Sequence, residues 1–119
     1  MSWLAAGVLC CAASVAAGAF GAHGLEARLE PSRLALWETA ARYLMYGGLT
    51  LAILGLKDPM TSKSLTAAGW CLLVGTLVFS ATVGALALDG PRWLGAITPI
   101  GGLLMILGLV LFAVGVWRG

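Results

Sequence analysis

The chain alternates long apolar runs with short polar segments, and these runs define its expected elements. They predict helices over residues 3–22, 33–56, 64–88 and 93–117. About 20 apolar residues at 1.5 Å per residue cross a hydrocarbon core roughly 30 Å thick. The pattern therefore predicts four transmembrane helices.

The second of these segments is the least apolar. Its uncharged part, Tyr43–Leu56, is short for a crossing, and extending it back to Arg33 brings in Glu38 and Arg42. Side chains four residues apart share a helical face, so these two opposite charges can meet. Because a paired charge costs less inside a membrane than a lone one, we favour the extended helix.

The connections after the first helix are short. Lys57-Asp58-Pro59 and Asp89-Gly90-Pro91 are turn sequences, and Pro31-Ser32 predicts a helix start with Ser32 as the N-cap. Short connections favour antiparallel neighbours, so the predicted fold is an all-α, up-down-up-down bundle. The tryptophans lie near the ends of the predicted helices, as in an aromatic belt: Trp3, Trp37, Trp70, Trp93 and Trp117.

Composition agrees with this class. The chain has 119 residues, 61% hydrophobic and only 10% charged, whereas soluble domains carry about 25% charge. The net charge of +2 comes from scattered basic residues, which argues against a nucleic-acid partner and leaves the lipid bilayer as the expected environment. The predicted loops on the two sides of the membrane carry equal numbers of basic residues, so the positive-inside rule predicts no membrane orientation.

Small residues recur at helical spacing and predict the packing faces, because close backbone approach holds membrane helices together. The predicted rows are Ser14, Gly18 and Ala22; Thr76, Ser80 and Gly84; and Gly101, Gly108 and Gly115. Within the last helix, Pro99 precedes Gly101 and Gly102 and predicts a kink, because proline removes one helical hydrogen bond.

The stretch GAFGAHGLE, residues 18–26, holds the only histidine and the first acidic residue. One interpretation is a cleavage site after a signal peptide, although such a peptide would begin with a basic segment. A retained helix is simpler, because three further membrane helices are predicted. Gly18, Gly21 and Ala22 would then allow close packing, and Gly24 would end the helix. The three cysteines lie inside apolar runs at no metal-type spacing, so we predict no metal site.

A candidate polar cluster joins the first two helices. Glu38, Arg42 and Tyr46 form a row at four-residue spacing, and His23 follows the adjacent helix. Ionisable groups inside a membrane are functional candidates by default. The hypothesis is that this cluster fixes the first helix to the second, with proton or headgroup handling as the alternative.

The runs GAFGAHGL, WETAARYLMY, GTLVFS and ITPIGGL occur in order along nearly the whole chain. In these runs the sequence resembles the small four-helix membrane proteins of unknown function that include transmembrane protein 256 and its bacterial relatives. The resemblance implies an integral protein of the bacterial cytoplasmic membrane, or of mitochondria in eukaryotes. It implies no established reaction.

Three hypotheses for function follow. The first is a non-enzymatic membrane protein that packs as a homo-oligomer or as an accessory subunit of a larger membrane complex. The second is a carrier or binding protein for a proton, lipid or quinone-like ligand, using His23, Glu38, Arg42 and the Pro99 kink. A membrane enzyme ranks third, because the sequence offers no nucleophile elbow, phosphate-binding loop or cofactor motif.

Overall fold

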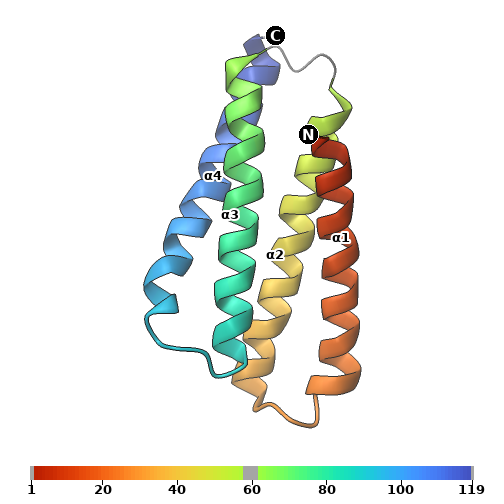
Figure 1. The fold of residues 1–119 in the computed structure, drawn as a ribbon, viewed down its shortest axis with the longest axis vertical. Helices are drawn as coiled ribbons and strands as arrows, with labels where there is room; N and C mark the ends of the chain where they lie inside the picture. The colour runs from red at the N-terminus through yellow and green to blue at the C-terminus, as the bar shows by residue number, and fades with distance from the viewer. Residues whose placement is uncertain (1, 58–61, 119) are drawn as a thin grey trace.

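The computed structural model describes residues 2–57 and 62–118, and every regular element in them is helical. The elements are α1 (Trp3–Phe20), a π-helical turn η1 (Gly21–Leu25), α2 (Pro31–Leu56), α3 (Lys63–Ala87) and α4 (Leu94–Arg118). The helices lie side by side and alternate in direction (Figure 1). The predicted all-α, antiparallel arrangement is confirmed.

Local chemistry explains where the helices begin. The Ser2 hydroxyl accepts a hydrogen bond from the Ala5 amide (3.1 Å) at the start of α1, and the Ser62 hydroxyl accepts one from the Leu65 amide at the start of α3. The prediction of Ser32 as an N-cap was wrong, because α2 already begins at Pro31. Proline suits the first helical position, where its missing N–H is not needed.

The end of the first helix also differs from expectation. Gly24 does not stop the helix, which continues as the π-helical turn to Leu25. Among the described residues no glycine has a positive φ, so Gly24 lacks the left-handed conformation of a helix-ending glycine. A turn over residues 26–29 then leads to α2.

The four helices pack as an antiparallel bundle in which each helix lies beside its neighbours in the chain. From one edge of Figure 1 to the other the order is α4, α3, α2, α1. Each helix packs mainly on its neighbours in the chain, and within the described residues α1 and α4 do not contact each other. Because α1 and α4 do not meet, α2 and α3 keep outer surfaces that no other described helix covers.

Glycine allows the backbones of α1 and α2 to approach closely. Gly7 lies directly against the backbone of Gly48 and Ala52, and a Cβ added at Gly48 would lie 2.9 Å from the Gly7 carbonyl oxygen. The predicted row of Ser14, Gly18 and Ala22 is correct only at Ser14, because Gly18 and Ala22 are exposed. Steps of four residues rotate by about 40° each, so the row turns away from α2. The observed contact face alternates steps of three and four: Gly7, Cys10, Ser14, Ala17 and Gly21.

Helix α3 uses two faces. The predicted row of Thr76, Ser80 and Gly84 is buried, and contacts of Thr76 with Gly47 and of Gly84 with Trp37 show that it faces α2. An adjacent face of α3 packs on α4, where Gly101, Gly108 and Gly115 are all buried, as predicted. Pro99 is exposed and α4 continues through it, while the adjacent Thr98 hydroxyl lies 2.7 Å from that of Thr82 on α3.

Two tryptophans do not serve as belt residues. Trp3 is buried against Gly69 of α3 and meets Trp70 edge to face, with ring centroids 5.1 Å apart. Trp37 is half-buried between α1 and α3. Trp70, Trp93 and Trp117 are exposed, as an aromatic belt requires.

The α3–α4 interface makes a matched prediction at two adjacent glycines. A Cβ at Gly101 would lie 2.6 Å from the Phe79 amide nitrogen, whereas one at Gly102 would find no atom nearer than 3.7 Å. We expect Gly101→Ala to destabilise the protein by about 1–3 kcal/mol through overpacking. Gly102→Ala is expected to be neutral or mildly stabilising, because alanine favours helix. Thermal unfolding in detergent checks both, and equal melting temperatures would contradict the observed interface.

Hydropathy separates α2 from the other helices. In the described residues, three helical segments are long and apolar enough to cross a membrane: Trp3–Leu25, α3 and α4. Helix α2 has the length, with 26 residues, but not the hydropathy. Because α2 lies between α1 and α3 along its length, it occupies the same layer as two apolar helices.

Candidate functional site

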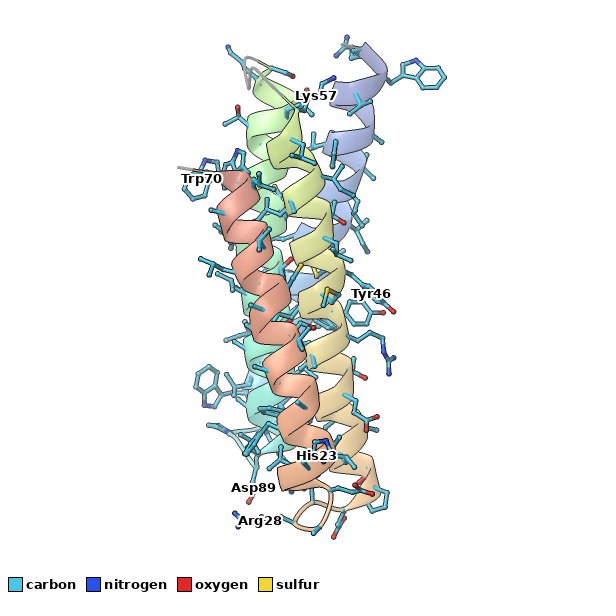
Figure 2. All side chains as sticks on the ribbon, turned by 90° about the vertical axis from the view of Figure 1, so that its right-hand side faces the viewer. His23, Arg28, Tyr46, Lys57, Trp70 and Asp89 are labelled. Atoms are coloured by element: carbon cyan, nitrogen blue, oxygen red, sulfur yellow. The ribbon has the colours of Figure 1, made fainter. Side chains whose placement is uncertain are left out.

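The structure places the four residues of the candidate polar cluster on exposed surface. No hydrogen bond or ion pair within the described residues joins His23, Glu38, Arg42 or Tyr46 to one another. Figure 2 shows His23 near one end of the molecule and Tyr46 near mid-height. Glu38, Arg42 and Tyr46 therefore share one exposed face of α2. His23 lies well below Tyr46 along the helix axis in Figure 2.

Hydrogen bonds between α1 and α2 fix these heights. The Ser14 hydroxyl donates to the Ala41 carbonyl (2.6 Å), and the Trp37 indole N–H donates to the Ala17 carbonyl (2.8 Å). Continuing this antiparallel register puts His23 level with the first residues of α2. Glu38 is then roughly 9 Å further along, and Arg42 roughly 15 Å, at 1.5 Å per residue. A function for any of these side chains stays a prediction.

The same register gives the depth of Arg42. Its neighbour Ala41 bonds to Ser14, which is the midpoint of the apolar segment Trp3–Leu25. Arg42 therefore lies level with the middle of that segment, five residues before Gly47, which contacts Thr76 near the middle of α3, and its side chain is exposed rather than turned into the protein. A charged residue at the centre of a membrane helix costs about 2.5–3.5 kcal/mol by insertion scales, so such residues normally face protein or water.

Arg42 belongs to a continuous exposed row that we call the α2 outer stripe. Its members recur every three or four residues, which places them on one helical face. They are Glu38, Arg42, Tyr46, Leu49, Ile53 and Leu56, and all are exposed. The stripe thus has a charged half and an apolar half. It combines charge and exposure with a position beside the apolar segment Trp3–Leu25, and we take it as the principal candidate site.

A second feature lies on the opposite face of α2. An apolar groove of about 330 Å³ is bounded by Ala17 of α1, Trp37, Ala41 and Leu44 of α2, and Ser80 and Gly84 of α3. Residues two apart point to opposite sides of a helix, so Leu44 points away from Arg42 and Tyr46. The groove is consequently separate from the α2 outer stripe. Its volume is at the lower end of the range for small-molecule sites.

One polar atom in this groove has no partner. The Ser80 hydroxyl is buried and makes no hydrogen bond within the described residues. A buried hydroxyl without a partner carries a desolvation cost of about 1–3 kcal/mol. None of His23, Glu38, Arg42 and Pro99 bounds the groove, so it is not the binding site that the sequence suggested for a carrier.

Sequence reasoning missed one ion pair. Arg33 at the start of α2 lies 3.0 Å from Asp89 in the α3–α4 turn, 56 residues away. Asp89 has a φ of 70°, a left-handed conformation that Asp and Asn tolerate better than most residues. Both side chains are well exposed, so the pair contributes little to stability. Separation in the sequence hid it, since only the fold brings the two segments together.

Metal chemistry finds no support in the described residues. They contain no group of three or more His, Cys, Asp or Glu side chains that could hold an ion. Cys10, Cys11 and Cys71 are free thiols. Neither the stripe nor the groove contains a nucleophile next to a general base, the arrangement that covalent catalysis requires.

Comparison with known proteins decides the family. Residues 17–102 match the family described as "Protein of unknown function (DUF423)", which is more than half of the chain. The chain belongs to the DUF423 family. A UPF0382 membrane protein of Staphylococcus haemolyticus is 46% identical over 112 residues, covering 94% of this chain and 92% of the relative. One of Staphylococcus saprophyticus is 44% identical over 105 residues, covering 88% of each.

This DUF423 protein is therefore an integral membrane protein, and its resemblance to a small membrane family of unknown function is confirmed. No solved structure matches it. The family match includes His23, the whole of α2 and the groove residues, but stops at Gly102 and leaves out most of α4.

Proposed function

We propose that this DUF423 protein is a non-enzymatic subunit that associates with another membrane protein through the α2 outer stripe. The observation that carries this proposal is the exposed position of Arg42 level with the middle of the apolar segment Trp3–Leu25. Lipid chains offer this guanidinium no hydrogen-bond acceptor, whereas a protein surface can. The bacterial relatives support placement in the cytoplasmic membrane.

Two further features support assembly over transport. The α1–α2 interface is tightly packed around Gly7, Gly48 and Gly55, and Ser14 and Trp37 bond across it. The groove on the other face of α2 does not extend to Arg42. The polar residues of α2 therefore lie on a rigid outer surface, which suits binding to a neighbouring protein.

The test is extraction from native membranes in a mild detergent, followed by native mass spectrometry of whatever copurifies. We expect a protein partner at fixed stoichiometry, either another polypeptide or a second copy. Arg42→Gln is expected to lower its recovery, while Lys57→Gln, which removes a charge at the end of α2, is expected to leave it unchanged. Recovery of the wild-type chain only as a monomer would overturn the proposal.

The groove favours a second candidate function, the binding of a lipid or quinone-like ligand. The hydrocarbon tail of such a ligand would fill the space between α1 and α3. A carbonyl oxygen of the ligand would accept a hydrogen bond from the Ser80 hydroxyl, which has no other partner in the described residues. This site differs from the polar cluster and Pro99 kink that the sequence suggested for a carrier.

The groove makes its own prediction through Gly84. A Cβ there would find no atom nearer than 3.8 Å, so a leucine side chain can extend into the groove. We expect Gly84→Leu to remove a stoichiometric lipid or quinone from the purified protein, as measured by mass spectrometry. Gly95→Leu is the matched control, because Gly95 is exposed with nothing within 4 Å. Equal ligand content in both variants and the wild type would reject the groove as the site.

A further inference from the structure

We propose that the partner of the α2 outer stripe is a second copy of this chain, joined by two reciprocal Glu38–Arg42 ion pairs. This inference rests on the function proposed above and adds the identity and geometry of the partner. Its starting point is that the stripe carries one acidic and one basic side chain four residues apart on the same exposed face. Such a surface is electrostatically complementary to itself.

Membrane insertion restricts the geometry of such a pair. Two copies inserted in the same direction are related by a two-fold axis along the membrane normal, so their α2 helices run parallel and at equal depth. A two-fold interface uses the same patch on both subunits, so the contact of Glu38 with the second copy's Arg42 occurs twice. The four-residue offset is about 6 Å along the helix, which the long Arg side chain can span.

The rest of the stripe fits the same interface. Beyond Arg42 it continues as Tyr46, Leu49, Ile53 and Leu56, with exposed fractions of 50–69%. Steps of four and three residues are those of a helix that packs lengthwise on a parallel partner. The apolar half would extend the contact toward the end of α2, while the ion pairs would fix its register.

Charge complementarity selects a second copy over a purely apolar partner. In the apolar layer an unpaired Arg42 or Glu38 is costly, and each copy supplies the partner that the other copy lacks. The most apolar helix, α4, also has many exposed aliphatic side chains, such as Leu103, Ile106 and Leu107. Those suit lipid, whereas the charged stripe does not.

A charge exchange with two tagged full-length chains tests the pairing. Two wild-type chains, co-expressed with different tags and extracted in mild detergent, are expected to capture each other. Glu38→Arg with itself, or Arg42→Glu with itself, places like charges opposite each other and is expected to lower capture by about tenfold or more. Co-expressing Glu38→Arg with Arg42→Glu restores both intermolecular pairs, so capture is expected to return to near the wild-type level.

The mixed pair distinguishes this interface from an ion pair within one helix. Each chain then carries two like charges at positions 38 and 42, so only the other chain can neutralise them. Lys57→Glu makes the same change in charge as Arg42→Glu outside the charged half of the stripe, and is expected to keep capture. If the exchanged chains do not accumulate, Glu38→Gln and Arg42→Gln replace them, and each is expected to lower capture.

Three results would overturn the inference: no capture between wild-type chains, unchanged capture for both exchanges, or no recovery in the mixed pair. A different protein recovered with wild-type chains that do not capture each other would reject the second copy and keep the proposed function. A chain recovered only as a monomer would reject both.

Discussion

Replacing Gly7 by leucine is expected to prevent stable packing of α1 on α2. Gly7 lies against the Ala52 amide nitrogen and the Gly48 carbonyl oxygen, so any side chain here meets backbone atoms that cannot rotate away. The helices must then separate along their length, and we expect a loss of more than about 3 kcal/mol, above the usual cost of overpacking. Measured by size-exclusion chromatography and thermal unfolding in detergent, the variant is expected to aggregate.

Gly18→Leu is the matched control for this prediction. It adds the same side chain to the same helix at a position with nothing within 4 Å. The variant is therefore expected to behave like the wild type, or to gain slightly from the better helix propensity of leucine. If Gly18→Leu were the more damaging of the two, the observed α1–α2 interface would be wrong and the four-residue row of small residues would be right.

The second large effect is expected at Trp37. Its ring lies against Gly21, forms an edge-to-face pair with Phe20 and borders the groove, while its indole N–H bonds to the Ala17 carbonyl. Trp37→Ala removes all of these contacts and is expected to cost about 3–5 kcal/mol. Thermal unfolding in detergent measures the change in stability.

Trp37→Phe separates the contribution of packing from that of the hydrogen bond, and Trp117→Ala serves as the control. Trp37→Phe keeps most of the packing but loses the hydrogen bond, so its expected cost is nearer 1 kcal/mol. Trp117→Ala removes a tryptophan that is 90% exposed and is expected to leave stability unchanged. An equal effect of Trp37→Ala and Trp117→Ala would contradict the structural role of Trp37.

Some features of the candidate site could be predicted from the sequence, and others needed the tertiary structure. The row of Glu38, Arg42 and Tyr46 could be found from the sequence, because a four-residue spacing on a helix is a local property. Its exposure could not, because that depends on where α1 and α3 contact α2. His23 was placed with this row by its position at a helix end, and the α1–α2 register puts it level with the start of α2 instead.

The groove could not be predicted from the sequence at all. Its residues come from three helices, and of them the sequence predicted only Ser80 and Gly84 to be packing residues. Trp37 was expected in an aromatic belt, since its position near a helix end is visible in the sequence whereas its contact with Gly21 is not. A space between helices depends on side chains that are distant in sequence, so no local pattern predicts it.

By itself, the sequence determined the four helices, their approximate ends and their antiparallel order, since hydropathy and turn residues act over a few neighbouring positions. It also determined the family, through motifs that run along most of the chain. Only the tertiary structure decided that α1 and α4 stay apart, that Gly7 rather than Gly18 faces α2, and that Arg42 is exposed level with the middle of the first apolar segment. The physical reason is that helix register and facing depend on how backbones and side chains fit across interfaces, which sequence spacing alone does not specify.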